Sequence, residues 1–242
     1  MPNPVTGFAV CKTVVLFCLF LALALVVHTP ALLAMDGLTV AQKVFNRDDG
    51  QDAYAKMEMV LIDKRGKKRS RVLITATKDF GKLSKTYTCF TEPAAIEGTG
   101  FLTWENEDGD DDQFLYLPAL RRVRRIVSRQ KDNRFVNTDY TYEDMQKRKP
   151  KKDNHRILRS EVFNDYECWV LESVPRDADD SQYSKRVNWI VKDIFVPVKT
   201  EYYDKKGRLT KVFRALALQK IDGIWTILQS EMHDLNFVAA PL

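Results

Sequence analysis

The side chains best suited to chemistry in this sequence form a cluster of four arginines, which we call the arginine cluster. Forked guanidinium donors match phosphate and carboxylate groups, so the cluster predicts an anion-binding rim for lipid headgroups or for an acidic partner. The alternative is a solvated face on which the arginines pair with the preceding acids. The cluster consists of Arg121, Arg122, Arg124 and Arg125, and the acids are Glu105, Glu107, Asp108, Asp110, Asp111 and Asp112.

Nucleic acid is a poor match for this cluster. The basic run is short, and no helix-turn-helix or stacking-aromatic signature accompanies it. The formal net charge of the chain is +5, which is only mildly basic. We therefore expect contact with an anionic surface only where the charge is concentrated, as it is in the arginine cluster.

Residue types that perform catalysis are not arranged in a recognisable active site. His155 and His233 lie far apart in the sequence, and neither begins a metal-ligand spacing. The sequence has no Gly-x-Ser-x-Gly elbow, no His-Glu-x-x-His motif and no phosphate-binding loop of the Gly-x-x-x-x-Gly-Lys-Ser/Thr type. We expect a protein that is not an enzyme and has no cofactor or metal.

The N-terminus has the pattern of an export signal. Lys12 precedes an apolar run over residues 13–27, and a small-residue site ends at Ala34. This pattern predicts a secretory signal peptide, residues 1–34, that is cleaved near Ala34 to leave one domain, residues 35–242. The alternative is an uncleaved membrane anchor, although the run is short for a spanning helix of about 20 residues.

Two cysteines lie beyond the predicted signal peptide, Cys89 and Cys168. In an oxidising exported compartment they could form one disulfide. Two buried thiols on separate strands are the alternative, because a free cysteine behaves as a small apolar residue.

The elements that must position these residues are short strands. Acidic or glycine turns separate many of the runs with period two, which is typical of an antiparallel meander. Segments 36–46 and 137–145 have the apolar spacing or the capping residues of short helices. The predicted strands cover residues 52–62, 69–78, 83–91, 100–105, 113–117, 121–127, 156–163, 167–174, 185–193, 197–203, 209–218 and 224–235.

A meander of this length curls, and the predicted helices are few and short. The sequence therefore predicts a mainly β, α+β domain in which a single curved antiparallel sheet forms an open half-barrel with helices on its concave side. We expect a lipid-binding cavity in this half-barrel, with ordinary core packing as the alternative; methionines would suit a deformable wall for flexible acyl chains. The predicted cavity residues are Met57, Met59, Leu61, Leu73, Trp104, Phe114 and Tyr116.

Three motifs resemble those of the bacterial outer membrane lipoprotein-sorting proteins of the LolA-like group. They are Phe-Leu-Thr-Trp at 101–104 before an acidic turn, the run 112–126 that contains the arginine cluster, and Asp-Tyr-Thr-Tyr-Glu-Asp at 139–144. The runs 189–192, 197–199 and 202–204 are similar to the same group. The resemblance implies an open half-barrel, a periplasmic location and carriage of an acyl or lipid group in a hydrophobic cavity.

Two functions are compatible with this resemblance. The first is a monomeric carrier that transports lipoprotein acyl chains or another lipid toward the outer membrane, with the headgroup near the arginine cluster. Members of the subgroup also resemble companions of resistance-nodulation-division type exporters. The second function is therefore a non-catalytic accessory module that docks on such an inner-membrane exporter or on an outer-membrane acceptor.

Overall fold

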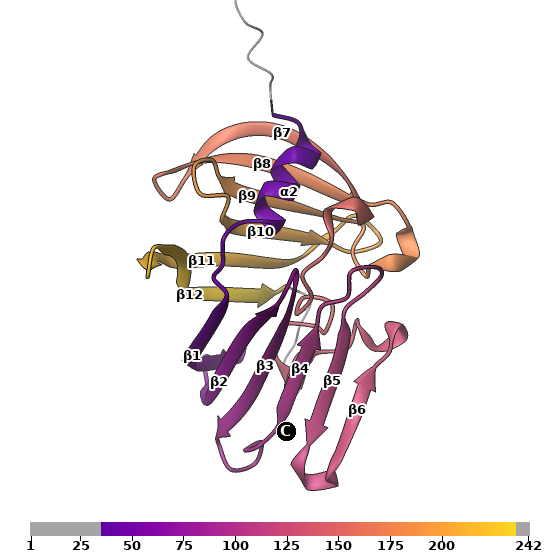
Figure 1. Ribbon diagram of the computed structural model, residues 1–242, viewed down its shortest axis with the longest axis vertical. Coiled ribbons are helices and arrows are strands. Elements are labelled where there is room, and N and C mark those ends of the chain that lie inside the picture. The colour runs from indigo at the N-terminus through magenta and orange to yellow at the C-terminus, as the bar shows by residue number, and fades with distance from the viewer. Residues whose placement is uncertain (1–34, 236–242) are drawn as a thin grey trace, which may run out of the picture. The chain divides into compact units, whose positions relative to one another are not determined.

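The computed structural model describes residues 35–235, which form two six-stranded antiparallel sheets and one α-helix (Figure 1). Each sheet is a meander, because every strand pairs with its neighbours in the chain. The first sheet contains β1 (Asp52–Ile62), β2 (Lys68–Phe80), β3 (Leu83–Glu92), β4 (Gly100–Trp104), β5 (Asp112–Leu117) and β6 (Arg122–Ile126). The second contains β7 (Asp153–Phe163), β8 (Tyr166–Pro175), β9 (Lys185–Val191), β10 (Pro197–Tyr203), β11 (Leu209–Ile221) and β12 (Ile224–Asp234).

All twelve predicted strands are present in the predicted order, which confirms the mainly β class. The expectation of a single sheet is wrong, because pairing ends at β6 and restarts at β7. The predicted signal peptide, residues 1–34, lies outside the described residues. None of the helices described in residues 35–235 combines the length and the apolar character that crossing a bilayer requires.

Side-chain chemistry in the turns explains why the strands end where they do. In the β1–β2 turn, Asp63 Oδ1 accepts hydrogen bonds from the backbone N–H groups of Arg65 and Lys67, at 2.9 and 3.0 Å. Gly66 has a φ of 77°, a conformation that favours glycine. Aspartate and glycine therefore fix this reversal locally, as the sequence predicted.

The helix α2 (Gly37–Phe45) confirms the helix predicted at 36–46. Asp36 caps it by accepting a hydrogen bond of 2.7 Å from the backbone N–H of Thr39. The helix packs closely on β7 of the second sheet, because a Cβ atom at Gly37 would lie only 2.7 Å from the carbonyl carbon of His155. Figure 1 shows α2 lying across the strands of the second sheet.

A connecting segment, residues 127–152, links the sheets with short turns. The helix predicted at 137–145 is wrong. Asp144 Oδ2 accepts hydrogen bonds from the backbone N–H and the hydroxyl of Thr141, at 2.8 and 2.9 Å, and these bonds close a turn. The Thr and Asp side chains of this segment stabilise a turn that is not continued as a helix.

The connecting segment covers the core of the first sheet. Phe135 and Tyr142 from this segment are buried, and the Phe135 ring lies 4.9 Å from the ring of Phe101 in β4. Gln113 in β5 donates a hydrogen bond of 2.9 Å from Nε2 to the carbonyl of Tyr142. The buried residues of the sheet in this core are Leu73, Phe90, Phe101, Leu115 and Ile126.

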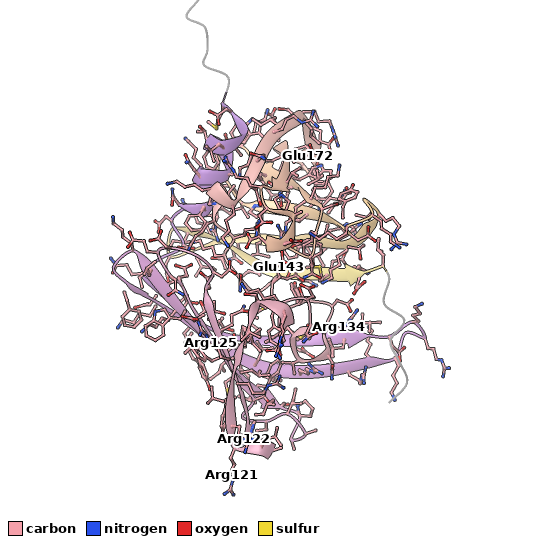
Figure 2. The ribbon with its side chains drawn as sticks, turned by 90° about the vertical axis from the view of Figure 1, so that its right-hand side faces the viewer. Arg121, Arg122, Arg125, Arg134, Glu143 and Glu172 are labelled. Atoms are coloured by element: carbon pink, nitrogen blue, oxygen red, sulfur yellow. The ribbon has the colours of Figure 1, made fainter. Side chains whose placement is uncertain are left out.

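The same segment is fastened to the second sheet by buried charges. Asp144 accepts from Lys211 Nζ in β11 at 2.9 Å and from the Tyr183 hydroxyl at 2.7 Å. Glu143 pairs with Arg186 in β9, and Figure 2 shows Glu143 next to the second sheet. The 139–144 motif therefore joins the core of one sheet to the face of the other.

Cys89 in β3 and Cys168 in β8 are free thiols on strands of different sheets. No disulfide joins them, and they lie on separate strands as the alternative predicts, but only Cys168 is buried, because Cys89 is partly exposed. Burial raises the pKa of the Cys168 thiol to about 11. A thiol with so high a pKa is a poor nucleophile at neutral pH.

Candidate functional site

The seven predicted cavity residues divide between two faces of the first sheet. Residues that pair directly across antiparallel strands share a face. Met57 pairs with Leu73, so these residues lie on one face together with Met59 and Leu61. This face continues through Phe90 into the core that the connecting segment covers.

The other three predicted residues lie on the opposite face. Phe114 pairs with Arg125 across β5 and β6, and Trp104 and Tyr116 have the same phase as Phe114. Trp104 and Tyr116 are 43% and 38% exposed, whereas Leu73 is 2% exposed. The seven residues thus cannot line one cavity. Alternation assigns two faces within each strand, but the phase between strands depends on connections and on irregularities such as the one at Val72 and Leu73.

The arginine cluster is exposed along the last hairpin of the first sheet. Arg125 pairs with Asp112, as the solvated-face interpretation predicts. The other three form no ion pair with any residue in 35–235. Arg122 and Arg124 lie on the core-facing side of β6, and Arg121 precedes the strand with a φ of 49°. Figure 2 shows Arg121 and Arg122 at the end of the hairpin, away from Arg125.

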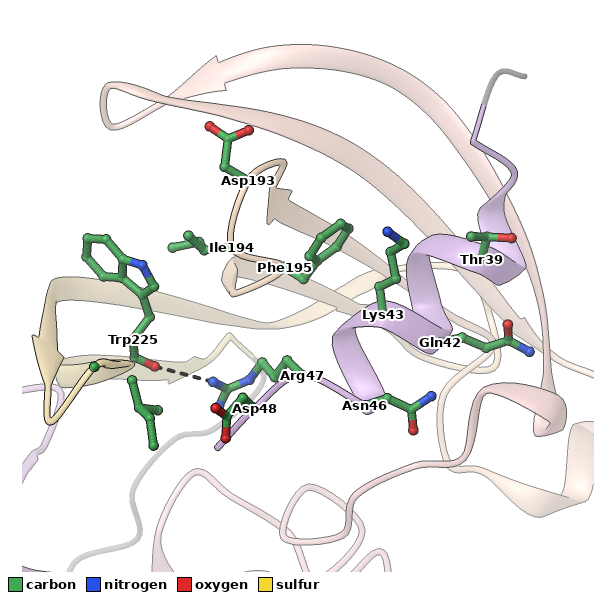
Figure 3. Close-up of a pocket in the computed structure, with 12 residues that line it drawn as sticks. Thr39, Gln42, Lys43, Asn46, Arg47, Asp48, Asp193, Ile194, Phe195 and Trp225 are labelled. Atoms are coloured by element: carbon green, nitrogen blue, oxygen red, sulfur yellow. Dashed lines mark hydrogen bonds between the residues drawn. The ribbon is translucent and has the colours of Figure 1, made fainter. Parts of the chain in front are cut away.

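A cavity of about 680 Å³ lies on the second sheet, between α2 and two hairpin turns (Figure 3). We call it the α2 groove. Its volume is within the range of about 300 to 1,000 Å³ that is usual for small-molecule sites. None of the predicted cavity residues lines it. The lining residues are Thr39, Gln42, Lys43, Asn46, Arg47 and Asp48, then Asp193, Ile194 and Phe195 of the β9–β10 turn, Gly223 of the β11–β12 turn, and Ile224 and Trp225 at the start of β12.

The apolar wall of the α2 groove is built by the β9–β10 turn. Phe195 has a φ of 54°, which is uncommon for an aromatic residue. Two backbone hydrogen bonds hold this conformation, from Phe195 N–H to the Val191 carbonyl at 2.9 Å and from Val191 N–H to the Val196 carbonyl at 3.0 Å. The Phe195 ring also stacks on Trp169, with the ring centroids 5.6 Å apart. The turn thus holds the ring as a fixed surface of the groove.

The opposite wall of the groove is polar and carries two cations. Lys43 Nζ lies 4.9 Å from the centroid of the Phe195 ring, within the range of a cation–π contact. Arg47 donates a hydrogen bond of 3.3 Å from Nη1 to the Trp225 carbonyl, which links the segment just after α2 to the start of β12. Asp48 and Asp193 add two carboxylates to the lining. The groove therefore combines an apolar wall with two cations and two carboxylates, which suits an amphiphile that has an apolar part and a polar part.

The lining offers no arrangement of nucleophile and base, and residues 35–235 contain no group of three or more metal-ligating side chains. A second, much smaller cavity of about 20 Å³ lies between the acidic turn after β4 and the connecting segment. It has room for roughly one water molecule. Asp111, which lines it, is 7% exposed, and its Oδ2 has no hydrogen-bond partner among the described residues.

Sequence reasoning missed the residues of the α2 groove, among them Lys43, Arg47, Phe195 and Trp225. One signal was available for each wall. Lys43 and Arg47 are spaced four apart at the end of the predicted helix, and Phe195 is an aromatic residue inside a turn. No pattern in the sequence placed these two walls next to each other, because about 150 residues separate them.

Comparison with known proteins gives a consistent answer. A family model described as "Uncharacterized protein" matches residues 82–237. No curated protein sequence matches the chain. A domain from Vibrio parahaemolyticus described as an outer membrane lipoprotein-sorting protein is 36% identical; the match covers 82% of this chain and 85% of that one, with a TM-score of 0.76.

Two further structures extend the comparison. A DUF1329 family protein from Desulfovibrio piger is 33% identical over 82% of this chain and 85% of that one, with a TM-score of 0.77. A LolA superfamily protein from Nitrosomonas europaea shares the fold, at 19% identity, 84% and 87% coverage and a TM-score of 0.62. On the identity and coverage of the first two structures, the chain belongs to the LolA-like family of outer membrane lipoprotein-sorting proteins.

Proposed function

We propose that this protein is a periplasmic carrier that binds lipoprotein acyl chains or another lipid in the α2 groove for transport toward the outer membrane. The observation that carries the proposal is a cavity of about 680 Å³ whose lining combines an apolar wall with two cations and two carboxylates, in a member of a lipoprotein-sorting family. The working form would be a monomer of residues 35–242, after cleavage near Ala34. It would act without catalysis or a cofactor.

The lining of the groove suits such a ligand chemically. An acyl chain would lie against Ile194, Phe195 and Trp225, and apolar burial contributes about 25 cal/mol per Å². Lys43 and Arg47 would bind a phosphate or carboxylate of the headgroup. One buried chain would contribute on the order of several kcal/mol, which is enough for binding and still allows transfer to a partner.

The test is lipid binding by the purified, delipidated protein, measured by native mass spectrometry and by displacement of a fluorescent fatty acid. Trp225→Ala removes part of the apolar wall and should weaken binding by roughly tenfold. Trp104→Ala is the matched control, because Trp104 is exposed on the first sheet and should leave binding unchanged. A wild-type protein that binds no fatty acid, phospholipid or lipopeptide would contradict the proposal.

The predicted cavity residues on the core-facing side of the first sheet remain candidates for a second lipid contact. Met57 is 44% exposed there, and Met59 and Leu61 are partly exposed. Met57→Glu should fold normally because its side chain reaches solvent. If this variant loses lipid while Trp225→Ala retains it, the lipid site lies on the first sheet and not in the α2 groove.

The second candidate function is a non-catalytic accessory module of a resistance-nodulation-division type exporter. The observation that favours it is the exposed arginine cluster, of which Arg121, Arg122 and Arg124 have no ion pair with a described residue. This function predicts a protein that binds no lipid and whose Arg122→Ala, Arg124→Ala variant loses partner binding. A pull-down with the purified exporter subunit would measure this loss.

A further inference from the structure

The hairpin between β5 and β6 ends in an amphiphilic tip, residues 118–124. A short 3-10 turn, Pro118–Leu120, leads into Arg121, whose φ of 49° directs the chain into β6. Leu120 and Val123 are 60% and 64% exposed, which is high for aliphatic side chains. Val123 lies on the face of β6 opposite to Arg122 and Arg124, so the tip exposes aliphatic side chains on one side and cations on the other.

The positive charge of the β5–β6 tip is not neutralised by the acidic residues nearest in sequence. Those acids lie at the other end of β5, where Asp112 pairs with Arg125 and Asp110 pairs with Lys131 and Lys152. Arg121, Arg122 and Arg124 are exposed and form no ion pair with a residue in 35–235. Three guanidinium groups are thus available to an external anion.

The tip is also distinct from the α2 groove. The groove lies on the second sheet, and Figure 2 shows Arg121 and Arg122 at the far end of the first-sheet hairpin. The arginines therefore form a surface that is separate from the groove lining.

We propose that the β5–β6 tip docks on the surface of a lipid bilayer that contains anionic lipids. Leu120 and Val123 would enter the interface, and the three free guanidinium groups would bind lipid phosphates. A bilayer fits this tip better than an acidic protein does. A stable protein–protein interface needs about 800 Å² from each partner, whereas a bilayer requires neither such an area nor shape complementarity.

The experiment is flotation of the purified protein with vesicles of phosphatidylglycerol and phosphatidylcholine in equal parts, compared with vesicles of phosphatidylcholine alone. We expect the wild type to bind the anionic vesicles only. Each Lys or Arg at a membrane surface contributes about fivefold in affinity, so the triple variant Arg121→Gln, Arg122→Gln, Arg124→Gln should lose on the order of 100-fold. Leu120→Ser should weaken binding several-fold without a change in charge.

Two controls have the same chemistry at other positions. Arg125→Gln removes an arginine that Asp112 already pairs and should change binding little. Lys64→Gln, Arg65→Gln, Lys67→Gln removes three charges from the β1–β2 turn, and it should have a much smaller effect than the tip variant. Circular dichroism verifies that each variant is folded.

Three results would overturn the proposal. They are equal binding of the wild type to both kinds of vesicle, unchanged binding by the triple tip variant, and a larger loss from the β1–β2 turn than from the tip. If the wild type binds neither kind of vesicle but binds polyglutamate, and the triple tip variant loses this binding, the tip is instead a site for an acidic protein. Trp225→Ala should leave vesicle binding intact, so failure of the carrier function is distinguishable from failure of this proposal.

Discussion

Asp111 is a buried carboxyl group next to the acidic turn of the first sheet. Burial raises its pKa above the ordinary value of 3.8, and the nearby Glu105 carboxylate raises it further. A group of this kind favours the folded state when it is protonated. Its contribution is present below the unfolded pKa and is lost as the pH rises through the folded pKa. At neutral pH the ionised Asp111 therefore costs stability.

Asp111→Asn should consequently make the protein more stable at pH 7, and the gain should disappear as the pH falls below about 3.8. Asp112 provides the opposite control, because hydrogen bonds from Asn106 and Arg125 lower its pKa. Asp112→Asn should therefore be destabilising at pH 7 and nearly neutral at low pH. Urea unfolding at several pH values measures both variants. Curves that shift equally at every pH would contradict this assignment.

At the level of single residues, the sequence predicted the ion pair of neighbouring charged residues better than it predicted which side chains are buried. Arg125 and Asp112 were identified as candidates for an ion pair, and they form one. Phe135 and Tyr142, which complete the core of the first sheet, were not predicted to be core residues, because their burial depends on a sheet that lies before them in the chain. Side-chain identity is local information, whereas burial is not.

At the level of elements, α2 depends on a close approach that only glycine allows. Gly37→Ala would place a Cβ atom 2.7 Å from backbone atoms of His155 and would force the helix away from β7. We expect destabilisation of about 1 to 3 kcal/mol, although alanine is the better helix former by about 1 kcal/mol.

Urea unfolding tests the Gly37→Ala variant, with Gln42→Ala on the exposed side of the same helix as the control for stability alone, because Gln42 lines the α2 groove. The control should stay within about 0.5 kcal/mol of the wild type. A Gly37→Ala variant that is more stable than the wild type would show that helix propensity dominates. Displacement of α2 should also reduce lipid binding in the α2 groove.

The strands were predictable because their signals are short-range. Period-two alternation and turns such as Asp63 to Gly66 place both ends of a hairpin within a few residues of each other. The helix predicted at 137–145 failed because Thr141 and Asp144 bond to each other within one turn, and the following residues do not continue it. Capping residues alone do not distinguish a helix from a closed turn.

At the level of the whole molecule, the 139–144 motif couples the two sheets through a buried ion pair. The Asp144 and Lys211 side chains are 1% and 5% exposed. Asp144→Asn would leave the Lys211 ammonium group buried without its counterion. We expect a loss of about 3 to 5 kcal/mol, because an unpaired buried charge is costly. Unfolding in urea measures this loss.

Hydrogen exchange should report the same change locally. In Asp144→Asn the amides of β11 and of the segment around Tyr142 should exchange faster, because both have lost their shared contact. Lys192→Gln is the control, since its partner Glu167 is 75% exposed and the pair should contribute less than about 1 kcal/mol. Equal losses of stability in Asp144→Asn and Lys192→Gln would show that the buried ion pair does not stabilise the contact between the two sheets.

The division into two sheets could not be predicted from the strands. The alternation of residues in β6 and β7 does not indicate that these two strands remain unpaired. Their separation depends on how the connecting segment packs. The location of the α2 groove could not be predicted for the same reason. Its walls come from the beginning and the end of the described chain.

The meander order of both sheets has a consequence for how the protein is made. Each strand pairs with the one synthesised just before it, so a nascent chain can form hairpins as soon as they emerge. The first sheet nevertheless stays uncovered until Phe135 and Tyr142 have been added. We expect an early intermediate in which the apolar face of the first sheet is exposed to solvent. A chaperone would need to cover this face until Tyr142 and β11, which contacts Asp144, have been synthesised.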